Sequence, residues 1–153
     1  DRLSLVIEER RPVLWLVRPN GIFLVSDDGV LLDRVSAANL NPIPVVVDPA
    51  SQTDLGLARL VSAARTLREH QQGFFERLTE LRDTPRGPVA YIDGLAAPIF
   101  LSRRDVTKNV PNFQGLFVDQ LAKRPDLAKL RYIDLRWDDQ VAVGEPEEPG
   151  PRR

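Results

Sequence analysis

The sequence of 153 residues contains no cysteine, no methionine and a single histidine. Without cysteine the chain can form no disulfide bond or thiol nucleophile, and it offers no thiolate ligand to zinc. The lone histidine, His70, excludes every metal or catalytic site that needs two imidazoles. Any chemistry must therefore come from hydroxyl, carboxylate, basic and aromatic side chains, or from the backbone.

Long apolar runs and phosphate-binding motifs are missing as well. No stretch approaches the ~20 apolar residues that a transmembrane helix needs, and no signal peptide is present. Neither GxGxxG nor GxxxxGK[ST] occurs, so no loop that cradles phosphate is predicted. Because the sequence opens with Asp1 and holds no methionine, we expect it to be a piece of a longer protein.

The charge is nearly balanced, with 21 basic and 22 acidic residues and a net charge of −1. General nucleic-acid binders carry a basic excess, so we expect no nucleic-acid partner. Hydrophobic residues make up 42% of the chain, which is enough for a folded core. Residues 101–131 hold seven basic against three acidic residues, which favours a solvated face over contact with anionic lipid.

Short apolar runs and turn residues predict a meander over residues 12–32. Residues 3–7 resemble the end of a preceding strand, and the runs 13–17, 22–26 and 30–32 are separated by turn residues. The first turn is Pro19-Asn20-Gly21, and the second is Asp27-Asp28-Gly29, for which we expect a type I′ hairpin. Residues 33–44 predict a loop, and Val45–Val47 a short strand.

Two helices are predicted further along the chain. Apolar residues at 57, 60, 61, 64 and 67 indicate a helix over about 54–70, capped by Ser51 or Asp54. A second helix is expected to begin at Pro111, with Asn112 as its cap. Residues 74–83 fit a helical period, but the pair Phe74-Phe75 also suits a strand.

The remaining segments predict strands and an acidic tail. A hairpin is expected from 89–92 and 98–101, and a second from 130–137 and 141–143 around Asp138-Asp139. Residues 145–153, rich in proline and glutamate, are expected to be disordered. The fold class is therefore α+β, an antiparallel-rich mixed sheet with about two helices packed on one face.

Few residues suggest catalysis. His70 lies at the end of the first predicted helix, where a histidine complements the helix dipole. The pairs Asp27-Asp28 and Asp138-Asp139 lie at predicted turns, where aspartates bond neighbouring amides. Trp15, inside an apolar run, is expected in the core, whereas Trp137, among charged residues, is expected to be partly exposed. We predict no catalytic residue, no cofactor and no metal site.

The segment from Tyr132 to Val143 predicts a sheet edge that no later strand covers. An open edge is a template to which a partner can add a strand. Alternatively, Asp138, Asp139 and the prolines of the tail blunt this edge. The residues by themselves leave both interpretations open.

Three stretches carry family-specific patterns. Residues 6–13 fit V-x-x-E-R-x-P-V, residues 24–30 fit L-V-D-x-x-G-V except that Ser26 takes the place of the motif's aspartate, and residues 132–143 are similar to Y-I-D-L-R-Y-D-N-Q-V-A-V. They resemble, in order and spacing, the bacterial cell-division family FtsQ, called DivIB in Gram-positive bacteria. Trp137 replaces the usual tyrosine, and the family's L-P-x-L-x-G segment is poorly matched near residues 40–47.

The resemblance implies a domain arrangement. Residues 1–10 would be the end of a POTRA-like domain or a junction, and residues 11–144 the β domain that follows it. Residues 74–83 would then be a strand. Members are single-pass membrane proteins whose bulk lies outside the cytoplasmic membrane, so the membrane helix would precede this chain.

The resemblance also implies a non-enzymatic scaffold that binds the coiled-coil proteins FtsB (DivIC) and FtsL and helps regulate septal cell-wall synthesis. Their segment would add along the last strand of the β domain. The residues implied in partner binding are Tyr132, Arg136, Trp137, Asp139, Gln140, Val141 and Ala142.

Two other functions are compatible with the residues. A cell-wall glycan-binding or hydrolytic module would use the aspartates and tryptophans, which would have to converge in one cleft. The third hypothesis is a cytoplasmic interaction domain. A hydrophobic helix encoded upstream in the full gene would exclude this hypothesis.

Overall fold

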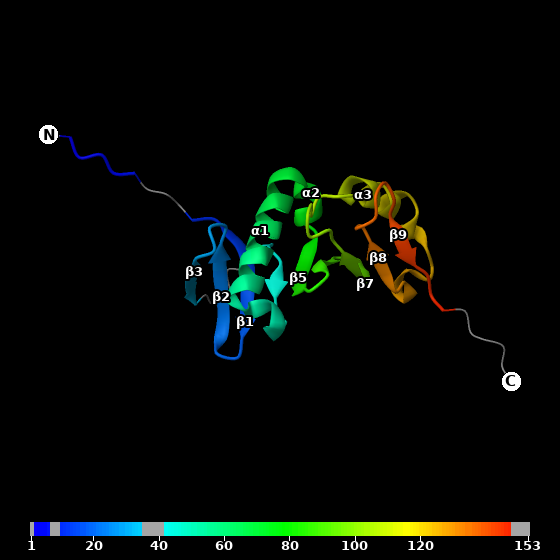
Figure 1. The fold of residues 1–153 in the computed structure, drawn as a ribbon, viewed down its shortest axis with the longest axis horizontal. Helices are drawn as coiled ribbons and strands as arrows, with labels where there is room; N and C mark the ends of the chain where they lie inside the picture. Colours follow the sequence, from blue (N-terminus) through cyan, green and yellow to red (C-terminus); the bar gives the residue numbers. More distant parts are fainter. Residues whose placement is uncertain (1, 7–9, 35–41, 148–153) are drawn as a thin grey trace.

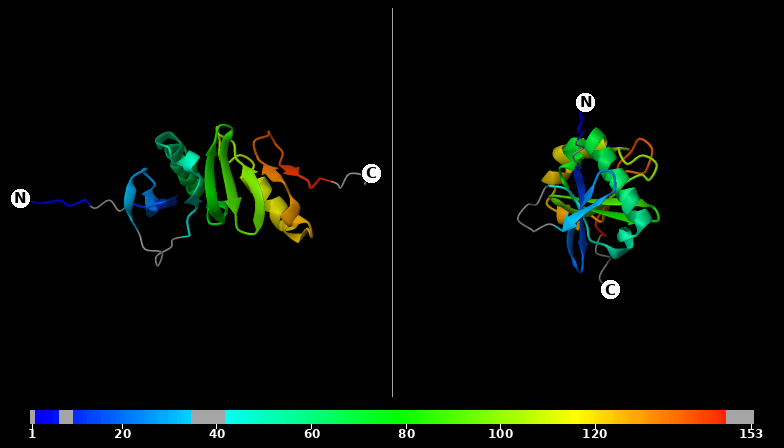
Figure 2. Two further views of the ribbon diagram at one scale, coloured as in Figure 1. Left: turned by 90° about the horizontal axis from the view of Figure 1, so that it is seen from below. Right: turned by 90° about the vertical axis from the view of Figure 1, so that its left-hand side faces the viewer.

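The computed structural model describes residues 2–6, 10–34 and 42–147, which form one nine-stranded mixed sheet with helices packed against it. The strand order is β3-β2-β1-β4-β5-β6-β7-β8-β9. Figures 1 and 2 show the sheet running along the molecule, with β3 toward the N-terminal end and β9 toward the C-terminal end. Five neighbouring pairs are antiparallel and three are parallel. The α+β prediction is confirmed.

The N-terminal meander has the predicted order. Its strands are β1 (Pro12–Arg18), β2 (Gly21–Ser26) and β3 (Leu31–Arg34). The turn between β2 and β3 differs from the predicted type I′ geometry, because only Gly29, at φ 83°, has a positive φ there. The Gly29 amide donates to the Ser26 carbonyl at 2.9 Å. The prediction of a strand over residues 3–7 is wrong for residues 3–6, which lie in no strand, and residue 7 is outside the described part.

Helix α1 (Asp54–His70) has the predicted bounds, but neither predicted residue caps it. The Thr53 hydroxyl accepts from the Gly56 amide at 3.1 Å and caps the helix. Ser51 lies in the short helix η2 (Pro49–Gln52), where its buried hydroxyl accepts from the Asp83 amide at 2.9 Å. β4 (Val45–Val46), before η2, links the meander to the rest of the sheet by parallel pairing with β1 and β5.

Residues 74–83, for which the sequence fitted both a helix and a strand, contain the end of a helix and most of a strand. Helix α2 (Gln72–Phe75) places Phe74 and Phe75 in the core, and β5 (Leu78–Thr84) follows after two residues. The strand that the resemblance implied is thus present from residue 78. β6 (Gly87–Ile92) and β7 (Leu95–Phe100) complete a tighter hairpin than predicted, turning at Asp93-Gly94.

Helix α3 (Val110–Asp119) begins one residue earlier than predicted. Asn109 holds the N-cap position, so the prediction that Asn112 caps the helix is wrong. Phe74 of α2 and Phe113 of α3 are both buried and meet edge to face at 6.2 Å between centroids. The helices therefore share one core on the sheet.

The C-terminal strands are shorter than predicted. After the short helices η3 (Leu121–Lys123) and η4 (Leu127–Lys129), β8 covers Tyr132–Asp134 and β9 covers Ala142–Gly144. The predicted strand over 130–137 is wrong at both ends, because Asp134 is the last residue paired with β9.

Candidate partner-binding site

The seven residues implied in partner binding all lie at the C-terminal end of the sheet. Tyr132 is in β8, Ala142 is in β9, and the other five lie in the connection between these strands, residues 135–141, called here the edge loop. β9 pairs with β8 on one side, and no other described strand pairs with it. The topology therefore gathers all seven residues beside one open strand edge.

Asp134 organises the start of the edge loop. Its side chain is buried and accepts four hydrogen bonds. Three come from Arg136, through the backbone amide at 3.0 Å, Nε at 2.9 Å and Nη2 at 2.7 Å. The fourth comes from Trp137 Nε1 at 3.1 Å. One carboxylate thus holds two of the seven residues implied in partner binding.

The pKa of Asp134 reflects two opposing effects. Burial disfavours the charged form and would raise the pKa, but the hydrogen bonds from Arg136 and Trp137 favour the carboxylate. The net result is a pKa below the ordinary value of 3.8. The same bond raises the pKa of the Arg136 guanidinium, so both groups stay charged at neutral pH. Asp134 is not among the residues predicted from the sequence, although a carboxylate two positions before an arginine and three before a tryptophan is a usable signal.

The Phe100 ring contacts both Arg136 and Tyr132. The Arg136 guanidinium lies 5.0 Å from the centroid of the Phe100 ring, within the range of a cation–π contact. Phe100 in turn stacks on Tyr132 at 5.7 Å. Tyr132 covers Gly144 on the paired strand, where a Cβ would come within 2.5 Å of the tyrosine ring. A side chain at position 144 would therefore clash with the Tyr132 ring, so the close approach requires glycine.

The edge loop exposes four consecutive side chains, and Trp137 is the most apolar of them. Its side chain is 56% exposed, as expected, while Trp15 is buried, also as expected. Asp138, Asp139 and Gln140 are exposed beside it. Asp138 forms an ion pair with Lys108, which lowers the pKa of the carboxyl. Asp139 adopts a left-handed φ of 55° and turns the loop back toward β9.

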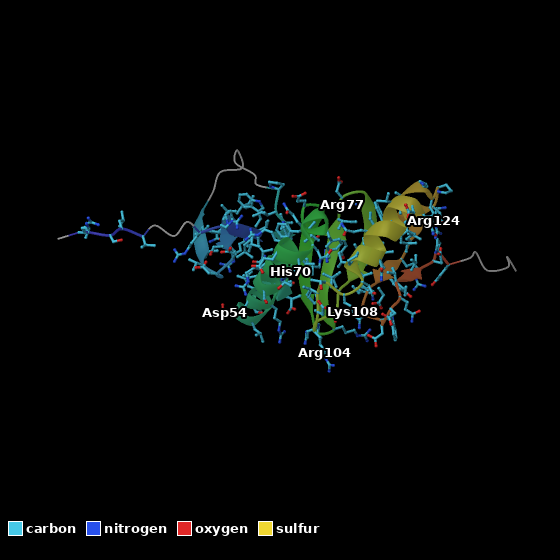
Figure 3. All side chains as sticks on the ribbon, turned by 90° about the horizontal axis from the view of Figure 1, so that it is seen from above. Asp54, His70, Arg77, Arg104, Lys108 and Arg124 are labelled. Carbon is cyan, nitrogen blue, oxygen red and sulfur yellow. The ribbon has the colours of Figure 1, made fainter. Side chains whose placement is uncertain are left out.

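Beyond β9, two ion pairs hold the following residues. Arg124 donates to Glu145 at 2.8 and 2.6 Å and also to Asp126, while Arg131 lies 3.6 Å from Glu147. Figure 3 shows Lys108 and Arg124 beyond opposite ends of α3. Three of the seven cations of residues 101–131, Lys108, Arg124 and Arg131, are thus paired with acids.

The residues considered for catalysis are exposed or engaged in ion pairs and turn hydrogen bonds. His70 is exposed, with Glu69 3.9 Å from its Nε2. Asp27 pairs with Arg68 at 3.0 Å, and Asp28 accepts from the Ser26 hydroxyl. Among residues 2–6, 10–34 and 42–147, no group of three histidines or acids could hold a metal ion. No helix in this described part is long and apolar enough to cross a membrane.

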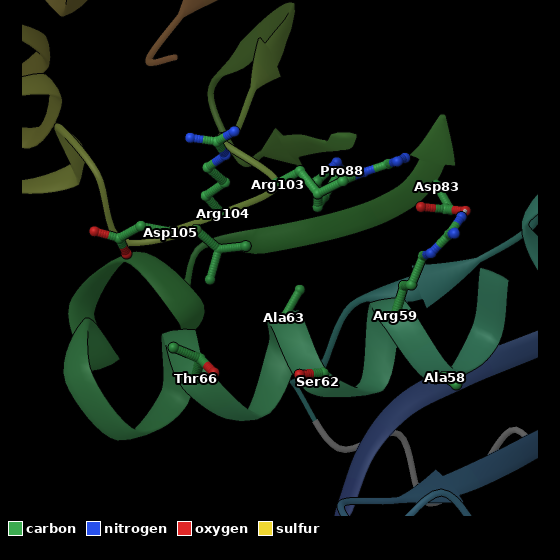
Figure 4. Close-up of a pocket in the computed structure, with 11 residues that line it drawn as sticks. Ala58, Arg59, Ser62, Ala63, Thr66, Asp83, Pro88, Arg103, Arg104 and Asp105 are labelled. Atoms are coloured by element: carbon green, nitrogen blue, oxygen red, sulfur yellow. Dashed lines mark hydrogen bonds and ion pairs between the residues drawn. The ribbon is translucent and has the colours of Figure 1, made fainter. Parts of the chain in front are cut away.

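A cavity of about 480 Å³ lies between α1 and the connection that follows β7 (Figure 4). Two acids line it. Asp83 faces Arg59 at 3.4 Å, and Asp105 accepts from the Thr107 hydroxyl at 2.6 Å. No aromatic side chain is part of its lining as described. The convergence of acids and tryptophans that a glycan-binding or hydrolytic module requires is therefore not found in this cavity.

Comparison with models of protein families matches most of the chain. A family model described as "Cell division protein FtsQ/DivIB, C-terminal" matches residues 13–136, which is most of the chain. The matched range includes Tyr132 and Arg136, and the other five candidate residues follow it. A search of curated proteins finds no match.

Proposed function

Because this chain belongs to the FtsQ/DivIB family of cell-division proteins, whose members are membrane-anchored, non-catalytic scaffolds, we propose that it binds the partner proteins FtsB/DivIC and FtsL. The partner's segment adds to the free edge of β9, and the contact helps regulate septal cell-wall synthesis. The domain then works on the extracytoplasmic side, tethered by a single membrane helix upstream of Asp1.

The observation that carries this proposal is that an open strand edge and an exposed aromatic residue held in a fixed position occur together. Backbone groups along an unpaired strand supply affinity for an added strand, and neighbouring side chains supply specificity. Trp137 lies next to β9, and its indole is tethered to the buried Asp134. A large aromatic held in place loses little conformational entropy on binding, which is typical of residues that dominate interfaces.

The electrostatic balance of the edge loop also suits a protein partner. Arg136 is engaged by Asp134, and Asp138 by Lys108, so these two charges are already compensated. Compensated charges cost less to desolvate when a partner covers them. The exposed Asp139 and Gln140 can form the polar rim that surrounds such a contact.

Calorimetric titration with the extracytoplasmic segment of the FtsB/DivIC protein tests the proposal. We expect the unchanged domain to bind and Trp137→Ala to bind at least tenfold more weakly, equivalent to about 1.4 kcal/mol. Val118→Ala is the matched control, because Val118 is 62% exposed on α3 and belongs to no candidate contact. Its affinity should equal that of the unchanged domain.

Two results would contradict this function. If the unchanged domain fails to bind the segment, strand addition at this edge is ruled out for the isolated domain. If Trp137→Ala and Val118→Ala bind equally well, the edge loop is not the contact. Thermal unfolding of both variants is measured first, to establish that each is folded.

A further inference from the structure

Asn109 occupies an unusual place at the start of α3. It holds the N-cap position, yet its side chain makes no capping hydrogen bond to the helix. Its backbone is left-handed, with φ 59° and ψ 7°, a region that asparagine tolerates better than most residues. An N-cap residue normally has an extended backbone and bonds the first turn with its side chain. Here the side chain is used elsewhere.

The side-chain amide of Asn109 reaches across to the edge loop. Nδ2 lies 3.1 Å from the Leu135 carbonyl oxygen, 2.6 Å from that of Trp137 and 3.2 Å from that of Gln140. An amide nitrogen carries two hydrogens, so two donors are shared among three acceptors. The acceptors come from the beginning, middle and end of the loop. No other described side chain donates to more than one carbonyl of this loop.

The orientation of this amide follows from its surroundings. Oδ1 of Asn109 accepts from Asn112 Nδ2 at 3.3 Å. The reversed orientation would place the amide oxygen against three carbonyl oxygens, which would repel it. Lys108, the preceding residue, pairs with Asp138 of the same loop. Two consecutive residues before α3 thus hold the edge loop, while Asp134 holds Arg136 and Trp137 near its start.

We infer that Asn109 is a positioning residue for partner binding: it presets the edge loop so that Trp137 and β9 are presented together. This inference rests on the function proposed above. Asn109 is itself half-buried and need not touch the partner. A loop that is already ordered spares the entropy that ordering it on binding would cost.

Asn109→Asp is the sharpest test, because it keeps the size of the side chain and its tolerance of a left-handed backbone while removing both donors. We expect about tenfold weaker binding of the FtsB/DivIC segment, with a less favourable binding entropy in calorimetry. Hydrogen exchange of residues 135–141 should be faster than in the unchanged domain, while exchange in the core strands should not change.

Asn109→Gly provides a second variant that accepts the left-handed φ and lacks the amide. Asn20→Gly is the control, since it makes the same replacement at an exposed residue of the turn between β1 and β2. We expect Asn109→Gly to act like Asn109→Asp and Asn20→Gly to act like the unchanged domain.

The outcomes separate this inference from the proposed function. Faster exchange in the edge loop with unchanged affinity would overturn the positioning role, and so would unchanged exchange in both Asn109 variants. If the unchanged domain does not bind, the proposed function fails, and the positioning role fails with it. Weaker binding confined to the Asn109 variants supports both.

Discussion

Asp134 is a buried carboxylate whose four hydrogen bonds all come from residues two and three positions further along the chain. Such a local network needs no distant part of the fold to form, but it needs the core to bury it. Hydrogen bonds to charged groups contribute more than neutral ones. The residue therefore links the stability of the edge to the geometry of the proposed contact.

We predict that Asp134→Asn lowers the free energy of unfolding by about 2 kcal/mol, as the loss of a buried charged partner does. The new amide nitrogen would face donors of Arg136 or Trp137, so at least one of these donors loses its partner. Urea denaturation of both proteins at neutral pH measures the difference. Asp138→Asn is the control: its carboxylate is 91% exposed, and a surface pair contributes about 0–1 kcal/mol.

The same prediction has a definite pH dependence. Because the folded pKa of Asp134 is lowered below 3.8, its carboxylate stabilises the fold fully above that value. The contribution is lost as the pH falls through the lowered folded pKa. The gap in stability between the unchanged domain and Asp134→Asn should therefore shrink in acid. A gap that stays constant down to pH 2 would show that the carboxylate charge is not what matters.

β9 is a strand of only three residues, so we expect the affinity of a partner for its edge to depend also on the loop before it. The sheet has a second terminal strand, β3, at the opposite end, which the sequence analysis did not consider as a binding edge. Backbone hydrogen bonds do not by themselves distinguish two edges. Trp137 beside β9 is the feature that favours the C-terminal edge, and a comparison of the two edges tests this choice.

We expect Val141→Pro to weaken binding of the FtsB/DivIC segment about fivefold, because proline removes one backbone donor directly before β9. Leu31→Pro makes the same change in β3 and should leave affinity unchanged. Calorimetry of the two variants, each shown to be folded, measures this. A larger loss of affinity in Leu31→Pro would assign the partner to the other edge.

At the scale of the whole molecule, one core joins a nine-stranded sheet to its helices. Phe113 is fully buried and contacts Phe74 of α2 and Phe117 of its own helix. These rings join the part of the helical layer that precedes β5 to the part that supports the edge loop through Asn109. The packing of these phenylalanines therefore helps to position α3, and through Asn109 the edge loop.

We predict that Phe113→Ala lowers the free energy of unfolding by about 3–5 kcal/mol, the usual cost of deleting a buried ring. Urea denaturation measures it, and Val118→Ala on the same helix should change stability by no more than about 0.5 kcal/mol. Phe113→Leu fills part of the cavity and should lie between them. A loss below about 1 kcal/mol in Phe113→Ala would show that α3 is not part of the cooperative core.

The predictions that held rest on local patterns. The helix over 54–70, the meander, the buried Trp15 and the exposed Trp137 follow from the spacing of apolar residues, from turn residues and from charged neighbours. Two of the errors concern helix caps, where the side chain expected to cap the helix bonds another group. Asn112 bonds Asn109 instead of capping α3, and Ser51 bonds β5 instead of capping α1.

The sequence by itself determined the fold class, the family and the segment from Tyr132 to Ala142 as the candidate contact, because periodicity, turn chemistry and motif spacing are properties of neighbouring residues. Only the tertiary structure decided which residues form β9, that Asp134 holds Arg136 and Trp137, and that Asn109 holds the edge loop. The Asp134 network is local in sequence but needs the core to bury it, and the Asn109 contacts join residues up to 31 positions apart, which no local pattern encodes.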